Sequence, residues 1–154
     1  MSIEKALLVP ANPFKYKEMG DVEFHKAHLN RNGGVFWDLI PMGRRDAPWK
    51  HPEIKSGYFY ISKVQVVEYW MSIECIKRWK EVDLGEVERY IPEPRKAYLQ
   101  SDPQTKTYYA ILIKDIRHLN REHKHKLNEF TLASSNQKVE RVQNYAIVVD
   151  PGWR

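Results

Sequence analysis

Two aromatic runs decide the fold of this chain: Gly33-Gly34-Val35-Phe36-Trp37-Asp38-Leu39-Ile40, and a longer run over residues 57–70. The paired glycines indicate a turn, and the apolar residues after them predict a strand over residues 35–40. In the second run, large apolar side chains alternate with polar ones such as Lys63, which predicts one half-buried strand over residues 54–69. Both runs therefore belong to a β-sheet.

Shorter signals on either side predict the remaining elements. An apolar run predicts a first strand over residues 5–9. Loosely helical spacing after Asp21, a good N-cap, predicts one short helix over residues 22–30, which Asn32-Gly33 ends. Further along the chain we expect a turn or two of helix over residues 72–80, a strand over 108–116 and a last strand from about residue 144.

The order of these elements predicts an α+β fold. Several strands, one or two short helices and no regular alternation between them favour a small mixed β barrel with short flanking helices over a parallel sheet. A chain of 154 residues is expected to form a single domain over residues 1–154. The stretch at about 81–104 carries three prolines and Gly85, and we interpret it as an insertion or a long excursion.

Composition places the chain among globular proteins. Hydrophobic residues make up 42% and aromatic residues 12%, against 29% charged residues. The formal net charge of +5 favours a polyanionic partner, although a moderate excess of charge also keeps proteins soluble. Cys75 is the only cysteine, which excludes an internal disulfide and is compatible with a reducing cytoplasm. No apolar stretch reaches the length of a membrane span, so we expect a cytoplasmic protein without a membrane partner.

The sequence contains no convincing catalytic or metal-binding motif. His25 and His28 are close on a helix, but a zinc site needs two further ligands, and His123 and His125 lie in a charged run that is more simply solvated. Neither a glycine-flanked serine nor a phosphate-binding glycine loop is present. We therefore expect no metal, no cofactor and no catalytic residue, while a hydrolase built from dispersed residues stays open.

Asp38 and the aromatic side chains have two interpretations each. Because Asp38 lies inside an apolar strand, its carboxylate needs a partner. That partner is either a cation such as Arg44 or Arg45, or the exocyclic amino group of a bound base, unless Asp38 is simply exposed on the polar side of the strand. Trp49 is the best candidate for a binding surface, because it lies in a loop flanked by cations. The other aromatic residues fill the core or line a base-binding cage: Phe36, Trp37, Tyr58, Tyr60 and Trp70.

The cations form two clusters in the sequence. The early cluster contains Arg44, Arg45, Lys50, His51 and Lys55, and the late cluster, over residues 117–126, contains Arg117, Arg121 and Lys124. If the fold brings both clusters onto one face, they would bind a nucleic-acid backbone with salt-sensitive affinity. Cations scattered over the surface are the alternative.

Several segments carry a resemblance to a known family. They are Ala6-Leu7-Leu8-Val9-Pro10-Ala11-Asn12-Pro13, Asn32-Gly33-Gly34-Val35-Phe36-Trp37, His51-Pro52-Glu53-Ile54 with Ser62-Lys63-Val64-Gln65-Val66-Val67, and Tyr108-Tyr109-Ala110-Ile111-Leu112-Ile113-Lys114-Asp115-Ile116. Their order and short patterns resemble the PUA-like superfamily, most closely its EVE branch, which is related to the ASCH and YTH domains. The chain departs from that family at Val22-Glu23-Phe24, where a tryptophan is usual.

The resemblance implies a compact PUA-like barrel that binds RNA or DNA and receives a flipped, often methylated base between aromatic walls. Carried over by position, the base pocket would be formed by Asn12, Phe14, Trp37, Asp38 and Tyr58, with Trp49 at its rim. EVE-like domains are also the N-terminal specificity modules of McrBC-type restriction proteins in archaea. In a protein of that kind, a C-terminal AAA+ motor domain would follow.

The sequence is compatible with three functions, given in order of preference. The first is a non-catalytic domain that recognises a methylated base in DNA for a modification-dependent restriction system. The second is an RNA-binding module of translation or RNA modification, because the same charge and aromatic content would serve it. The third is a small nucleotide hydrolase of ASCH type that depends on Asp38 or Lys63.

Overall fold

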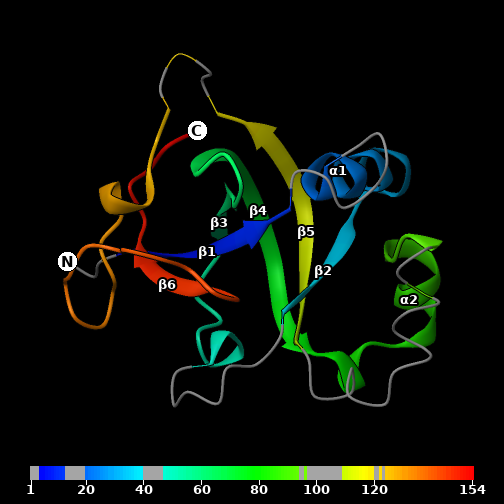
Figure 1. The fold of residues 1–154 in the computed structure, drawn as a ribbon. Coiled ribbons are helices and arrows are strands. Elements are labelled where there is room, and N and C mark those ends of the chain that lie inside the picture. The colour runs from blue at the N-terminus through cyan, green and yellow to red at the C-terminus, as the bar shows by residue number, and fades with distance from the viewer. Residues whose placement is uncertain are drawn as a thin grey trace.

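The computed structural model describes residues 4–12, 20–39, 47–93, 96, 109–119, 122 and 124–154. Within them, a mixed six-stranded sheet packs against α-helices, which confirms the α+β class (Figure 1). The order in the sheet is β2-β5-β4-β3-β1-β6; β1 and β3 are parallel, and the other neighbours are antiparallel. The strands are β1 (Lys5–Ala11), β2 (Val35–Leu39), β3 (Ser56–Ile61), β4 (Val66–Arg78), β5 (Tyr109–His118) and β6 (Ala146–Val149).

The predicted small mixed β barrel is not observed, because the sheet is open. Its outermost strands, β2 and β6, pair with β5 and β1 respectively, and no pairing joins β2 to β6 in the part of the chain that the structure describes. The right-handed twist of the strands curves the sheet without closing it (Figure 1). A bridge between Leu132 and Val148 continues the pairing beyond β6.

The single strand predicted over residues 54–69 is instead a hairpin. β3 ends at Ile61, residues 62–65 form a turn, and β4 begins at Val66. Gln65 has a left-handed φ of 58°, and its N–H donates to the carbonyl of Ile61 at 2.8 Å. Of the usual turn residues Gly, Pro, Asn, Asp and Ser, the turn contains only Ser62, so the alternation of the flanking strands gave no sign of the chain reversal.

The helix predicted over residues 72–80 is also wrong, because β4 continues to Arg78. The pairing of β4 with β5 shifts register between Ser72 and Ile73, and again between Ile73 and Cys75. A bulge of this kind changes which face the following side chain occupies. Ile73 and Ile76 therefore pack in the same cluster although they are three residues apart, and this spacing imitates one face of a helix.

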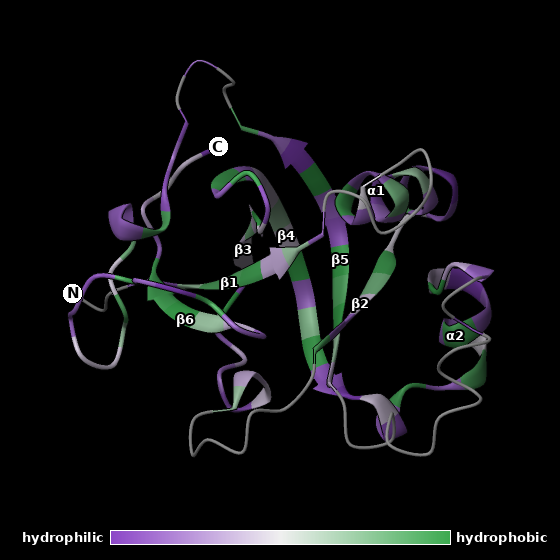
Figure 2. Ribbon diagram, viewed as in Figure 1, coloured by the Kyte–Doolittle hydropathy of each residue, from purple (hydrophilic) through white to green (hydrophobic). Residues whose placement is uncertain are grey.

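The sheet buries side chains on both faces. On one face, here called the α1 face, the largest apolar cluster includes Trp37 and packs against α1 (Asp21–Asn32). On the opposite face, here called the outer face, a second cluster around Tyr58 lies under the chain that follows β5, and a third lies under α2 (Leu84–Tyr90). Figure 2 shows hydrophobic residues along the strands and hydrophilic ones along much of both helices.

The ends of α1 are determined by local chemistry. Gly33 ends the helix in the left-handed region with a φ of 78°, and its N–H donates to the carbonyl of Leu29 at 2.8 Å, which confirms the predicted stop. The predicted N-cap is wrong, because Gly20 occupies that position. Asp21 is the first helical residue and is buried, with one carboxylate oxygen 3.2 Å from Nδ1 of His25.

The stretch predicted as an excursion contains α2. The helix begins with a capping box, in which Asp83 accepts from the N–H of Glu86 at 2.8 Å and the Glu86 carboxylate turns back to the N–H of Asp83 at 3.4 Å. The same carboxylate pairs with Lys77 of β4 at 2.8 Å and so ties α2 to the sheet. None of the described helices is both long and apolar enough to cross a membrane.

Candidate nucleic-acid interface

The structure does not assemble the predicted base pocket. Trp37 is 6% exposed on the α1 face, where its ring centroid lies 4.5 Å from that of His25 and 4.6 Å from that of Phe59. Tyr58 is fully buried on the outer face. Tyr58 and Phe59 are neighbours in β3, and successive side chains of a strand point to opposite faces. The prediction that Trp37 and Tyr58 line one pocket is therefore wrong.

The other predicted pocket residues are dispersed. Asn12 is exposed at the end of β1, and Asp38 is half-buried in β2 on the outer face. Trp49 is half-buried in a short 3₁₀ helix, and its ring lies 6.3 Å from that of Tyr109, which packs against the α1-face cluster. Phe14 lies outside the described residues. Trp49 is flanked by cations, as its sequence context indicated, but it is on the opposite face from Asp38 and Tyr58.

The predicted phosphate-binding cations that the structure describes lie near the two sides of β4. Lys55 precedes β3, and its carbonyl accepts a hydrogen bond from the N–H of Ile73 in β4. Arg117 of β5 lies opposite Trp70 of β4. The two cations therefore flank β4 on opposite sides, at positions that are three residues apart along β4. The other described members of this set lie beyond these two cations. Two of them, Lys50 and His51, lie beside Trp49, and Lys124 follows β5. Arg44, Arg45 and Arg121 lie outside the described residues.

One row of direct cross-strand partners organises the outer face. Arg117 of β5 is opposite Trp70 of β4, Trp70 is opposite Tyr58 of β3, Tyr58 is opposite Leu8 of β1, and Leu8 is opposite Ala146 of β6. Residues directly opposite one another share a face of the sheet, and the last four belong to, or pack against, the outer-face cluster around Tyr58. Because neighbouring strands are about 4.8 Å apart, Trp70 and Ala146 are about 14 Å apart along this row.

At one end of the row, Trp70 contacts two guanidinium groups. The Cζ atoms of Arg117 and Arg154 lie 5.7 and 4.9 Å from the centroid of its ring, within range of a cation–π attraction. Asp115 accepts from Nε of Arg117 at 2.7 Å. The two arginine side chains are nevertheless 68% and 47% exposed, so N–H donors remain available to a ligand. We call Trp70, Arg117 and Arg154 the Trp70 platform.

Tyr58 holds the segment 150–154 over this platform. Its hydroxyl donates to Oδ1 of Asp150 at 2.7 Å and accepts from Nη1 of Arg154 at 3.0 Å. Burial, and to a smaller extent the hydrogen bond to Asp150, raises the pKa of Tyr58, so its hydroxyl stays protonated at neutral pH. The ring of Trp153 packs edge-on against Tyr58 and stacks on His125 at a centroid distance of 3.6 Å. The position of Arg154 is thus set by the buried cluster.

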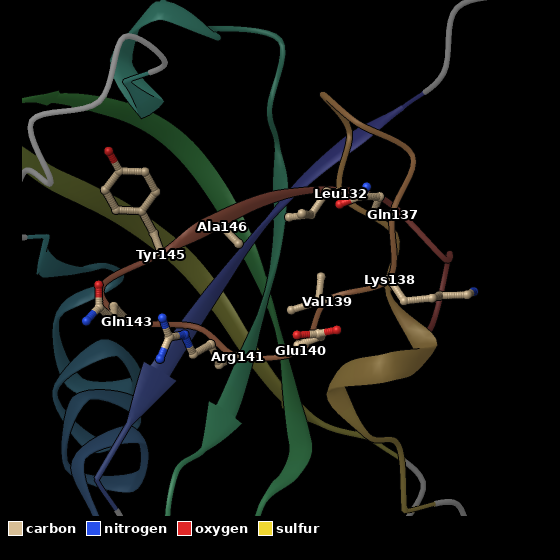
Figure 3. Close-up of a pocket in the computed structure, with 9 residues that line it drawn as sticks. All are labelled: Leu132, Gln137, Lys138, Val139, Glu140, Arg141, Gln143, Tyr145 and Ala146. Carbon is tan, nitrogen blue, oxygen red and sulfur yellow. The ribbon is translucent and has the colours of Figure 1, made fainter.

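At the other end of the row, a cavity of about 580 Å³ opens beside Ala146. Figure 3 shows it between the length of chain that carries Val139 and the first residues of β6, with Leu132, Val139 and Ala146 around its middle. Tyr145 points away from the opening and packs in the α1-face cluster. The polar side chains of the rim are Gln137, Lys138, Glu140, Arg141 and Gln143. Cavities of this size hold small ligands in many proteins.

Sequence reasoning selected Arg117 and left Trp70 open between core and cage, but it identified neither Arg154 nor the cavity. The alternation around Trp70 marked it as a sheet residue, which fits core or surface equally well. Arg154 reaches Trp70 across a long separation in sequence, and no local pattern reports such a contact. The cavity is formed by a loop that crosses back over the edge of the sheet, so only the folded chain reveals it.

No family model matches this chain, and no curated protein or solved structure matches it either. The class of protein is therefore defined by its structure: a small α+β domain with an open mixed sheet and a cation-flanked tryptophan on its outer face. Within the described ranges, no three His, Cys, Asp or Glu side chains gather in a way that could hold a metal ion. The resemblance to EVE domains stays a prediction.

Proposed function

We propose that this chain is a non-catalytic nucleic-acid-binding domain that stacks an unpaired base on the Trp70 platform. The observation that supports the proposal is the contact of one half-buried indole, Trp70, with two partly exposed guanidinium groups. Proteins that bind single-stranded nucleic acids stack bases on aromatic rings and on guanidinium planes. The formal net charge of +5 favours the approach of a polyanion.

The two arginines have different tasks in this proposal. Arg154 lies close to the Trp70 ring, so a base stacks on the outer plane of its guanidinium or on the uncovered part of the indole. Arg117 uses Nε for Asp115, which leaves its terminal N–H groups for the oxygens of a neighbouring phosphate. Stacking and phosphate binding therefore occur side by side on β4 and β5.

The finer proposal is a methylated base flipped out of duplex DNA, as the specificity module of a restriction system would require. It comes from the EVE resemblance alone. Stacking contributes about 1–3 kcal/mol per base, which is comparable with the few kcal/mol required to take a base out of the duplex. A methyl group in an apolar site adds only about 1 kcal/mol. An RNA-binding module is the alternative, since the platform itself recognises an unstacked base of either polymer.

The hydrolase hypothesis gains no support from the placement of its residues. Asp38 lies in β2 and Lys63 in the turn between β3 and β4, so β5 and β4 separate them in the sheet. A shared reaction centre would need both groups within hydrogen-bonding reach of one substrate. The two residues would have to act independently.

Fluorescence anisotropy with labelled single strands of about 12 nucleotides tests the proposal. Trp70→Leu keeps an apolar side chain in the cluster but removes the ring, and we expect binding to weaken about 5- to 150-fold, the equivalent of 1–3 kcal/mol. Trp79→Leu is the matched control, because Trp79 is a half-buried tryptophan of the third cluster. If Trp70→Leu binds as tightly as the wild type and is equally folded, the platform does not stack bases.

The phosphate contact has its own readout. Arg117→Gln should lower the slope of log affinity against log salt concentration by about 0.7–0.9, the change expected when one phosphate is no longer neutralised. Arg31→Gln, an exposed charge on α1, makes the same change in net charge and should leave the slope unaltered. Competition between DNA and RNA of equal length, and between methylated and unmodified duplexes, separates the finer proposals. An unchanged slope in Arg117→Gln contradicts the assignment of this arginine.

A further inference from the structure

The cavity beside Ala146 has a composition that the Trp70 platform does not explain. Lys138 and Arg141 stand on its rim on either side of Glu140, and all three are exposed. Among the described residues, neither cation forms a hydrogen bond or an ion pair through its side chain. Two cations against one acid give the rim a net positive charge. The Glu140 carboxylate lies between the two cations and would repel an anion, so an anionic group is favoured on the Arg141 side of the rim (Figure 3).

The middle of the same cavity is apolar. Leu132, Val139 and Ala146 belong to the outer-face cluster or pack against it, and Figure 3 shows them around the centre of the opening. A flat ring placed over them would bury apolar area on both sides of the contact. Gln137 and Gln143 stand on the rim, and each amide offers both donors and an acceptor, the combination that matches the edge of a base.

We propose that this cavity binds a single nucleotide, with its base over Leu132, Val139 and Ala146 and its phosphate on the guanidinium group of Arg141. A volume of about 580 Å³ is within the range of small-ligand sites. An inorganic anion would leave the apolar floor unused, and an uncharged apolar ligand would leave Arg141 unused. A nucleotide uses the floor, the amides and Arg141 together.

This inference rests on the proposed function and deepens it. The row of cross-strand partners puts Ala146 and Trp70 on one face of the sheet, about 14 Å apart, with the buried Tyr58 and Leu8 between them. A strand with one base stacked on the platform would have to cross the chain that covers Tyr58 to place a second nucleotide in the cavity. Two separated contacts on one strand raise the affinity above that of either alone.

NMR titration of ¹⁵N-labelled protein with adenosine 5′-monophosphate and cytidine 5′-monophosphate tests the site. We expect amide shifts in residues 137–146, with weaker shifts for adenosine and for inorganic phosphate. Arg141→Gln should raise the dissociation constant about tenfold, because it removes a charge-assisted contact to the phosphate. Lys126→Gln is the control, since Lys126 is exposed and lies outside the cavity.

Three outcomes separate the two proposals. Equal shifts with inorganic phosphate and the nucleotides would overturn the assignment of a base to the apolar floor. If residues 137–146 do not respond while oligonucleotide binding still depends on Trp70, the cavity proposal fails and the proposed function stands. If the cavity binds nucleotides with the expected dependence on Arg141 but oligonucleotide binding ignores Trp70, the platform proposal fails and the nucleotide site stands.

Discussion

Replacing Tyr58 with phenylalanine removes one oxygen atom from the most buried part of the outer face. The Tyr58 hydroxyl donates to Asp150 at 2.7 Å, and the Asp150 side chain is only 4% exposed, so water cannot replace the missing donor freely. The N–H of Gly152 also donates to the same carboxylate oxygen, at 2.8 Å, and survives the substitution. Because a bond to a charged group contributes about 1.5–3 kcal/mol and one partner remains, we expect the free energy of unfolding to fall by about 1.5 kcal/mol.

Urea denaturation followed by circular dichroism measures this destabilisation directly. For a domain of this size the same destabilisation lowers the melting temperature by about 3–6 °C. Tyr60→Phe is the matched control: Tyr60 is half-buried in the same strand, and its hydroxyl makes no hydrogen bond with the described residues. Its substitution should change the free energy of unfolding by less than about 0.5 kcal/mol.

The double variant Tyr58→Phe with Asp150→Asn isolates the pair. If the hydroxyl acts through the carboxylate, the two substitutions are less than additive, with a coupling of about 1 kcal/mol. Additive effects, or a Tyr58→Phe variant as stable as Tyr60→Phe, would refute the reasoning, because the cluster would then depend on the packing of the ring alone.

Three further predictions concern other parts of the fold. Burial lowers the pKa of His28, whose Nε2 lies 2.9 Å from the carbonyl oxygen of Arg89. As the pH falls, His28 is therefore protonated in the unfolded chain before it is protonated in the folded one. The stability that the neutral ring contributes is present above about pH 6.5 and is lost as the pH falls below it. Calorimetry between pH 7.5 and 5.5 should show a larger fall in melting temperature for the wild type than for His28→Gln, and parallel curves would contradict this. Gly57→Ala should cost about 1–3 kcal/mol, because a Cβ there would lie 2.9 Å from the carbonyl oxygen of Leu7 and 2.8 Å from Cε of Met71. Gly85 lies in α2, and a new Cβ there would meet only Oδ1 of Asp83, at 3.4 Å. Gly85→Ala should therefore stabilise the protein by up to about 1 kcal/mol. Urea denaturation checks both expectations, because the midpoint should fall in Gly57→Ala and rise in Gly85→Ala.

The sequence predicted those elements whose signals are local. The strands at the N-terminus, after Gly33-Gly34 and over residues 109–118 follow from apolar runs, and α1 ends at Gly33 because only a left-handed residue fits there. Asp83 and Glu86 also carried a readable capping box, although the interpretation as an excursion overlooked it. Where the local signal was ambiguous, as in the Ser62–Gln65 turn and the bulges of β4, the prediction was wrong.

The candidate site could not be predicted in the same way, because its geometry depends on pairing. Trp37 is covered because β2 pairs with β5 in a register that turns its ring toward His25 and Phe59. A shift of one residue would put the same ring on the outer face. Likewise, Arg117 and Trp70 meet only because β4 and β5 are neighbours, and single-sequence periodicity contains no information on which strands pair.

The proposed binding surface and the stability of the outer face depend on the same contacts. Arg154 is held by the Tyr58 hydroxyl at 3.0 Å and by Asp150 at 3.7 Å, so its guanidinium is positioned beside Trp70 before any ligand arrives. A side chain that is already ordered avoids an entropy cost of about 0.5–1.5 kcal/mol on binding. Arg117 is 68% exposed and is held by Asp115 on the same strand, so it keeps more freedom. Tyr58→Phe removes one contact of Arg154, which keeps the Trp153 carbonyl at 2.7 Å and Asp150 at 3.7 Å. It should therefore weaken base stacking modestly and leave the salt dependence, which Arg117 carries, unchanged.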